Sequence, residues 1–164
     1  MRGRSLDSVS IVVFDIDGVV ADVRHRVHLV EPPRRNWLRF FELAKDDPPS
    51  PEGVSWALRA AADHELVWLT GRPEWLRTVT TRWLERHGLP AGDLVMRPER
   101  DYRPARYYKV EALRALADRD IVVFVDDDPA VVQAAAAAGF TASLATWLPR
   151  STALSDAQER SGRT

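Results

Sequence analysis

The stretch Val9-Ser10-Ile11-Val12-Val13-Phe14-Asp15-Ile16-Asp17-Gly18 decides the fold class of this chain of 164 residues. Its first six residues form a short, β-branched and almost continuous apolar run, which is typical of a strand buried on both faces of a parallel sheet. The run ends abruptly in two aspartates and a glycine. Ligands of open α/β sheets bind beyond the carboxyl ends of the strands, so this stretch predicts both a buried strand and a binding edge.

Two further segments of the chain have the same design. An apolar run over 121–125 is followed by the aspartates of 126–128, and a run over 65–69 is followed by Thr-Gly-Arg-Pro at 70–73. Strands that alternate with helices predict an α/β fold, namely a Rossmann-like doubly wound parallel sheet with helices on both faces. Weaker strands are expected at 93–96 and 140–144, and helices at 51–63, 73–87, 107–117 and 129–138.

Residues 19–50 interrupt this rhythm. They carry many charges, two Pro-Pro pairs and one short amphipathic helix over 36–45. We interpret them as a small insertion after the first strand, which lies over the strand ends. The remainder of 1–150 is expected to form one domain, and 151–164 to form a polar, frayed C-terminal tail.

Composition restricts the class of protein. Hydrophobic residues make up 45% of the chain and the formal net charge is −1, which is enough apolar content for one core. The absence of cysteine excludes disulfides, thiolate chemistry and cysteine-bound zinc. There is no apolar run long enough to cross a membrane and no secretory signal at the start, so we expect a cytoplasmic protein. The near-neutral charge argues against nonspecific nucleic-acid binding through a broad basic surface, although a local basic rim remains compatible with it.

Acidic side chains gather at the predicted binding edge of the sheet. Several carboxylates crowded together repel one another, and a hard divalent cation resolves that conflict. Oxygen ligands without cysteine or histidine favour magnesium. Helix capping is the structural alternative, and it accounts well for Asp128 before Pro129 but poorly for the whole set. The set comprises Asp15, Asp17, Thr70, Arg72, Asp126, Asp127 and Asp128, with Lys109 near the start of the preceding helix.

The spacing of these residues suggests their roles. Asp15 and Asp17 are two residues apart, so their side chains lie on one side of an extended chain. One carboxylate can attack a phosphorus atom while the other supplies a proton to the leaving oxygen. The hydroxyl of Thr70 and the ammonium of Lys109 can hold the phosphoryl oxygens. Gly18 permits a tight turn and a close approach of the backbone.

The motifs, in order, resemble those of the haloacid dehalogenase-like superfamily of phosphohydrolases. They are FDIDG at 14–18, LTGR at 69–72, Lys109 and VDDD at 125–128. The resemblance implies that Asp15 is a nucleophile that forms an aspartyl-phosphate and that Asp17 is the general acid and base. It further implies that Thr70 and Lys109 stabilise the phosphoryl group. Magnesium would be held by Asp15, the main-chain carbonyl of Asp17, and Asp126 or Asp127.

Longer stretches are similar to the 3′-phosphatase domain of phage-type polynucleotide kinase. They are DIDGVVADVRHRVHL at 15–29, LTGRPE at 69–74 and VDDDPAVVQAAAAAG at 125–139. This resemblance implies substrate contacts from Arg26, Thr70, Gly71, Arg72 and Lys109, and we expect an exposed Arg26 that reaches toward a phosphate held over Asp15. The chain departs from the family pattern at Val19, Ala105 and Asp128. It has no Gly-x-x-x-x-Gly-Lys-Ser/Thr loop and therefore no kinase half.

These observations predict a magnesium-dependent phosphomonoesterase whose phosphate-ester substrate is a nucleic-acid 3′ end or a nucleotide. A phosphatase of small metabolites or nucleotides is the first alternative. A catalytically silent binding module is the second, which is disfavoured because no catalytic motif residue is missing. His25 and His28 lie close together beside Asp22, but they lack a third ligand and do not predict a zinc site.

Overall fold

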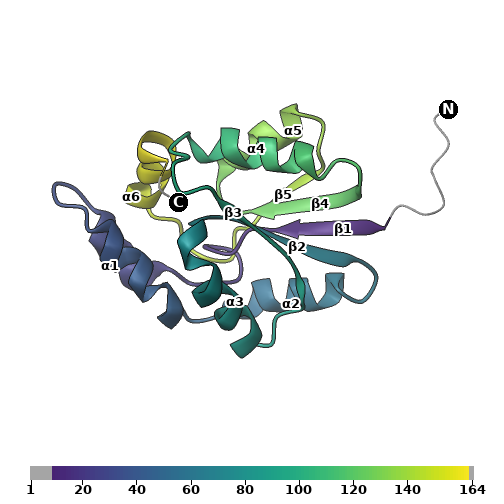
Figure 1. Ribbon diagram of the computed structural model, residues 1–164, viewed down its shortest axis with the longest axis horizontal. Helices are drawn as coiled ribbons and strands as arrows, with labels where there is room; N and C mark the ends of the chain where they lie inside the picture. Colours follow the sequence, from purple (N-terminus) through teal and green to yellow (C-terminus); the bar gives the residue numbers. More distant parts are fainter. Residues whose placement is uncertain (1–8, 163–164) are drawn as a thin grey trace.

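The computed structural model describes residues 9–162 and contains one five-stranded sheet in which all neighbouring strands are parallel (Figure 1). The strand order is β3-β2-β1-β4-β5, so β1, the strand named first from the sequence, is central. The expected Rossmann-like α/β class is confirmed. The strands span Ser10–Phe14 (β1), Glu65–Pro73 (β2), Gly92–Arg97 (β3), Asp120–Asp126 (β4) and Ala142–Leu144 (β5).

Helices cover both faces of the sheet. In Figure 1 α2 and α3 lie on one side of it, and α4 and α5 lie on the other. Ser50 caps α2 by accepting a hydrogen bond from the backbone N–H of Gly53, and Pro51 occupies the first turn. The helices span Pro51–Ala60 (α2), Arg77–Arg86 (α3), Ala105–Ala115 (α4) and Pro129–Ala137 (α5), with a short 3-10 turn over Glu74–Leu76 before α3.

The two faces of β1 build two separate cores. Val12 and Phe14 belong to the cluster under α2 and α3, whereas Ile11 and Val13 belong to the cluster under α4 and α5. Successive side chains of a strand point to opposite faces, so a continuous apolar run supplies both clusters at once. This explains why the run is unbroken by polar residues until the strand ends.

The insertion folds over the carboxyl ends of the strands. It contains a 3-10 helix over Arg24–Val30, helix α1 over Trp37–Glu42 with Asn36 as its cap, and a second 3-10 turn over Leu43–Asp46. Phe40 and Phe41 are buried in a third apolar cluster together with Leu76 and Met96. The aromatic residues of the insertion therefore attach it to the sheet domain.

The C-terminal segment differs from the expected frayed tail. Thr152–Asp156 form helix α6 and Ala157–Ser161 form a π-helical turn, whereas residues 163–164 lie outside the described part. Leu154 is buried in the cluster of the insertion, which explains why the segment is ordered against the domain. Figure 1 shows α6 near α1, on the side where the strands end. Across residues 9–162, every helix is too short or too polar to span a bilayer.

Candidate active site

Three carboxylates meet where β1 and β4 end, and we call Asp15, Asp126 and Asp127 the acidic cluster. Each offers an oxygen, and these oxygens lie within 4.8 Å of one another. All three residues are buried. Lys109 enters the cluster from α4, with its Nζ 2.9 Å from an oxygen of Asp15 and 2.5 Å from an oxygen of Asp126. A parallel sheet thus brings together residues that are more than a hundred positions apart in sequence.

Negative charge exceeds positive charge inside the acidic cluster. Burial raises the pKa of Asp15 well above its usual value, and the nearby Lys109 only partly opposes this effect. Burial likewise raises the pKa of Asp127 to about 7, against the influence of Arg150. Burial alone would lower the pKa of Lys109, but Asp126 and Asp15 raise it above its ordinary value. The cluster therefore holds a charged lysine and still lacks positive charge for its carboxylates.

One oxygen of the acidic cluster is left without a partner. Asp126 accepts from Lys109 and from the backbone N–H of Asp128, and Asp127 Oδ2 accepts from Arg150 Nη1 at 2.7 Å. Asp127 Oδ1 is buried and accepts no hydrogen bond from any described residue. A buried, unpaired carboxylate oxygen among other carboxylates is suited to a hard divalent cation. The residues present therefore fit magnesium.

Gly18 brings the backbone after β1 against this cluster. Its φ is +80°, and a Cβ atom at this position would lie 2.1 Å from Asp127 Oδ2. Glycine is needed here for two reasons, since a side chain would be strained by the backbone angle and would collide with a carboxylate. The turn predicted from the sequence is thus also the contact between the β1 loop and the end of β4.

A second charged group lies beside the first, and we call Asp17, Arg26, Asp47 and Arg72 the arginine network. Arg72 donates to Asp17 Oδ1 from Nη2 at 2.6 Å and from Nε at 3.0 Å. Arg26 Nη2 donates to the same oxygen at 3.2 Å. Both arginines also bind Asp47, which comes from the insertion. All four residues are buried, and their two positive and two negative charges are balanced.

The arginine network lowers the pKa of an aspartate, whereas the acidic cluster raises it. Burial would raise the pKa of Asp17, but Arg72 and Arg26 outweigh it and lower the pKa to about 2. Asp17 is therefore ionised at neutral pH in this state. Its Oδ1 accepts all three arginine bonds, whereas Oδ2 accepts none from the described residues.

Arg26 is not exposed, contrary to the expectation from the sequence. Its relative accessibility is 0%, and its guanidinium contacts the Phe40 ring at 4.2 Å in addition to Asp47 and Asp17. Arg72 is equally buried and binds Thr80 besides the two carboxylates. The expectation was wrong because a charged residue within a polar stretch of sequence carries no signal of a partner 21 positions away. As substrate contacts, both arginines stay predictions.

Thr70 and Gly71 lie near the end of β2, adjacent to β1 in the sheet. Thr70 is buried, and its hydroxyl oxygen accepts a hydrogen bond from the backbone N–H of Arg72. The hydroxyl of Tyr108 donates to the Thr70 carbonyl at 3.1 Å. Tyr108 precedes Lys109 in α4, so this bond joins α4, which carries Lys109, to β2, which carries Thr70.

Sequence reasoning missed two residues of these groups, Asp47 and Arg150. Asp47 lies within a run of charges and prolines that has the pattern of a solvated loop. Arg150 follows the last strand, directly before the segment that was expected to be frayed, and it binds Asp127 and Asp128. The residues Ser151, Leu154 and Ala157 have the spacing of a capped, half-buried helix, and that pattern could have indicated order near Arg150.

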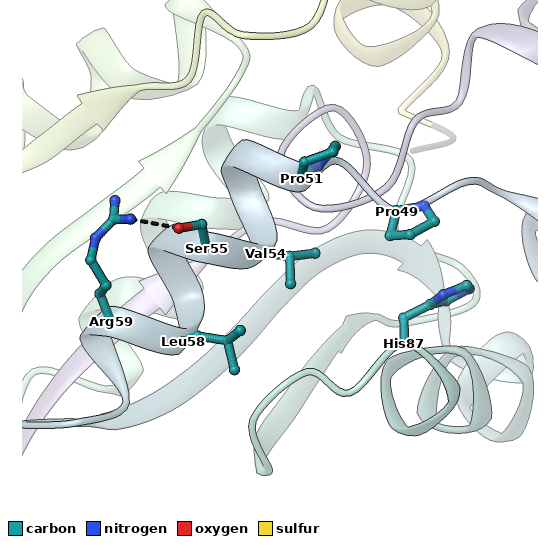
Figure 2. Close-up of a pocket in the computed structure, with 7 residues that line it drawn as sticks. All are labelled: Pro49, Pro51, Val54, Ser55, Leu58, Arg59 and His87. Atoms are coloured by element: carbon teal, nitrogen blue, oxygen red, sulfur yellow. Dashed lines mark hydrogen bonds between the residues drawn. The ribbon is translucent and has the colours of Figure 1, made fainter.

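Space beside the acidic cluster is small. A cavity of about 20 Å³ is lined by Gly18, Arg24, Asp127 and Arg150 among others, which is room for about one water molecule. A larger cavity of about 500 Å³ lies elsewhere, between α2 and the end of α3 (Figure 2). Its lining includes Leu58, Arg59 and His87 but no residue of the acidic cluster. Of these two cavities, the smaller one is the one that reaches the acidic cluster.

Comparisons with known proteins show a match in family and in fold. The model of the family described as the polynucleotide kinase PNKP phosphatase domain matches residues 9–143. A chain of the solved Pnkp1/Rnl/Hen1 RNA repair complex is similar in structure, with a TM-score of 0.74 and 18% identity. The match covers 90% of this chain and 46% of the other, so this chain spans about half the length of that relative.

Two other solved structures share the fold at greater distance. The class C acid phosphatase from Bacillus anthracis has a TM-score of 0.59 and 18% identity, over 76% of this chain and 54% of that one. An L-2-haloacid dehalogenase from Xanthobacter autotrophicus has a TM-score of 0.56 and 18% identity, over 90% of this chain and 81% of that one. No curated protein matches the sequence. At these identities the structural likeness concerns the fold alone.

Proposed function

This chain belongs to the family of polynucleotide kinase phosphatase domains, within the haloacid dehalogenase-like phosphohydrolases, and from that premise we propose a magnesium-dependent polynucleotide 3′-phosphatase that works through an aspartyl-phosphate. The observation that carries the proposal is the buried contact of Asp15 with Lys109 at the end of β1, next to the unpaired oxygen of Asp127. Groups with perturbed pKa values that converge at a strand end are typical of catalytic sites.

Asp15 is the nucleophile in this proposal. One of its oxygens attacks phosphorus, the bond from phosphorus to the ester oxygen breaks, and the leaving oxygen takes a proton from Asp17. Water then attacks the phosphoryl group and gives its proton to Asp17. The bond between phosphorus and Asp15 breaks, which regenerates the carboxylate and releases inorganic phosphate.

Positive charge is needed before a phosphate can approach the acidic cluster. Lys109 supplies part of it, and the hydroxyl of Thr70 binds a phosphoryl oxygen. Bound magnesium would supply the rest by neutralising carboxylates and phosphoryl oxygens, with Asp15, Asp126, Asp127 and the Asp17 carbonyl as the residues to hold it.

Asp17 is suited to the second step as it stands, because its low pKa keeps it ionised and able to accept a proton. In the first step Asp17 must carry a proton, because it gives that proton to the leaving oxygen. A phosphate bound next to Asp17 brings negative charge, which raises the pKa of that carboxyl and attracts the guanidiniums of Arg26 and Arg72. Substrate binding thus favours the protonated form that the leaving group requires.

The experiment that tests the proposal is a substrate panel with magnesium. It contains a 3′-phosphorylated oligonucleotide, the same oligonucleotide with a 5′-phosphate, nucleoside monophosphates and an aryl phosphate, with Asp15→Asn as the inactive control. We expect the highest kcat/KM for the 3′-phosphorylated oligonucleotide and a steeper loss with salt than for the aryl phosphate. Equal salt slopes and efficient nucleotide hydrolysis would instead identify a phosphatase of small molecules. Absence of phosphate release from every substrate would identify a binding module.

A further inference from the structure

We infer that a cleft lined by the exposed rings of Trp75 and Tyr102 binds the nucleobase of the nucleotide whose 3′-phosphate is removed. The cleft has a volume of about 100 Å³, and we call it the aromatic cleft. Its lining includes Phe41, Pro73, Trp75, Arg97, Asp101 and Tyr102. The inference rests on the proposed function and adds recognition of a base to recognition of a phosphate.

The aromatic cleft lies at the edge of the sheet that carries the acidic cluster. Pro73 is the last residue of β2, and it is paired with Arg97, the last residue of β3. Thr70, the proposed phosphoryl contact, precedes Pro73 by three residues in β2, which is roughly 10 Å along a strand. The sugar and base of one nucleotide can span that length together. A phosphate held at Thr70 therefore places its own base within reach of the cleft.

Two large aromatic side chains of the aromatic cleft are exposed to solvent. Trp75 is 49% exposed and Tyr102 is 51% exposed. The Phe41 ring lies 5.9 Å from that of Trp75 at an interplanar angle of 86°, so these two rings meet edge to face and do not stack. Single exposed aromatic residues are common on protein surfaces, but two of them in one cleft mark a binding site. Nucleobases of every kind stack on such rings.

Hydrogen bonds hold both aromatic residues in place before a ligand arrives. Arg77 Nη1 donates to the Leu94 carbonyl at 2.9 Å, which joins the turn after β2, with its tryptophan, to β3. Arg97 Nη1 donates to the Arg103 carbonyl at 2.9 Å, which joins the loop after β3, with its tyrosine, to the end of the same strand. Because both segments are attached to one strand, little conformational freedom is lost when a base binds.

The charges of the aromatic cleft favour a base over a second phosphate. Glu99 and Asp101 both line it, and their carboxylates repel an anion. Carboxylate oxygens only accept hydrogen bonds, and the edges of nucleobases carry N–H donors. A cleft with aromatic rings and carboxylates therefore fits the base of the terminal nucleotide, whereas the next phosphate of a polynucleotide must lie outside it.

The test compares two oligonucleotides with a 3′-phosphate that differ only in whether the terminal nucleotide carries a base or is abasic. The variants are Trp75→Ala, which removes the ring, and Trp75→Phe, which keeps one. Tyr107→Ala is the matched control, because Tyr107 is 54% exposed but does not line the cleft. Phosphate release with magnesium gives kcat and KM for each protein and each substrate.

In the parent protein we expect loss of the base to lower kcat/KM at least about fivefold, since stacking of one base supplies that much affinity. Trp75→Ala should lower kcat/KM for the base-bearing substrate by a similar factor, through KM, and leave the abasic substrate unchanged. Trp75→Phe should retain most of the preference for a base, and Tyr107→Ala should match the parent. Equal kcat/KM values in the parent, or a full preference in Trp75→Ala, would overturn the base site while the proposed function stands.

A second variant covers the case in which Trp75→Ala does not fold. Tyr102→Ala removes the other exposed ring from a loop, and we expect the same selective loss for the base-bearing substrate. A folded Tyr102→Ala protein with the parent's preference would then contradict the inference.

Binding separates failure of the base site from failure of the proposed function. If the parent protein released phosphate from neither oligonucleotide, the proposed function would fail. Calorimetry on the Asp15→Asn protein then compares a nucleoside 3′-monophosphate with ribose 3-phosphate, both with magnesium. Tighter binding of the nucleotide that is lost on adding Trp75→Ala would support the base site, and equal binding of the two ligands would overturn it.

Discussion

The acidic cluster and the arginine network are both buried and are neighbours through Asp15 and Asp17, yet they shift the pKa of an aspartate in opposite directions. Asp15 and Asp127 have raised pKa values, whereas the pKa of Asp17, two residues from Asp15, is lowered to about 2. Burial acts on all three in the same direction. The positive partners decide the outcome. Two arginines bind Asp17, whereas Asp15 shares Lys109 with Asp126 and Asp127 shares Arg150 with Asp128.

This difference separates two tasks within one site. A balanced network satisfies its own charges and is suited to holding side chains in place. An unbalanced cluster lacks positive charge for its carboxylates, and a bound cation can supply that charge. The first is a property of the folded chain alone, and the second is a binding capacity.

The largest expected effect comes from the acidic cluster. Asp15→Asn keeps the shape of the side chain but replaces the nucleophilic carboxylate by an uncharged amide, so turnover should fall by at least about 10⁴-fold. Phosphate release and a far-ultraviolet circular dichroism spectrum measure activity and folding in the same preparation. A folded Asp15→Asn protein with near-normal turnover would exclude the aspartyl-phosphate route.

Breaking the balance of the arginine network should mainly cost stability. Arg26→Met leaves two buried carboxylates with one guanidinium, and loss of one partner from a buried ion pair costs about 3–5 kcal/mol in free energy of unfolding. Urea denaturation measures this change in the free energy of unfolding. The control is Arg103→Met, because Arg103 is half-exposed and pairs with Asp101 and Glu111 at the surface, where such pairs contribute little. Equal effects of the two substitutions would show that the network is not balanced as described.

Binding of magnesium to the acidic cluster should stabilise the fold. At a concentration of magnesium 100 times its dissociation constant, the free energy of unfolding should rise by about 2.7 kcal/mol. Thermal unfolding with and without magnesium measures this, and Asp127→Asn should reduce the gain because the unpaired Oδ1 is replaced. The same gain in both proteins would place the cation elsewhere.

The smallest expected effect is a dependence of stability on pH. Because the pKa of Asp17 is lower in the folded protein than in the unfolded chain, its ionisation stabilises the fold above about pH 4. That contribution, about 2 kcal/mol, is lost as the pH falls from about 4 to 2. The difference in unfolding free energy between the parent and Asp17→Asn should shrink over this range. A constant difference would mean that Asp17 titrates normally.

Sequence reasoning predicted the fold and the acidic cluster from local patterns. Each apolar run that ends in polar residues marks a strand end, and parallel strands collect those ends at one edge, so Asp15, Asp126 and Asp127 come together for topological reasons. Lys109 follows from the same argument, because α4 leads into β4. The roles of these residues in catalysis stay predictions.

The arginine network had no such local signal. Arg72 and Asp17 are 55 positions apart, and Asp47 reaches both arginines from an insertion whose path the periodicity of the sequence does not specify. The same reason explains the errors on Arg26 and on the C-terminal segment. Long-range pairing turned an expected surface arginine into a buried one, and Leu154 and Arg150 attached an expected free tail to the domain.

Gly18 has a consequence for how this chain tolerates mutation. Gly88 and Gly139 also have positive φ angles, but a Cβ atom at either position would meet nothing within 4 Å. A library that varies all three positions should retain asparagine at 88 and 139, since that residue accepts the left-handed region at modest cost. At 18 it should retain glycine alone, because any side chain would displace Asp127. Three glycines with similar backbone angles would therefore tolerate different substitutions. The intolerant position would be the one where the loop after β1 packs against the end of β4.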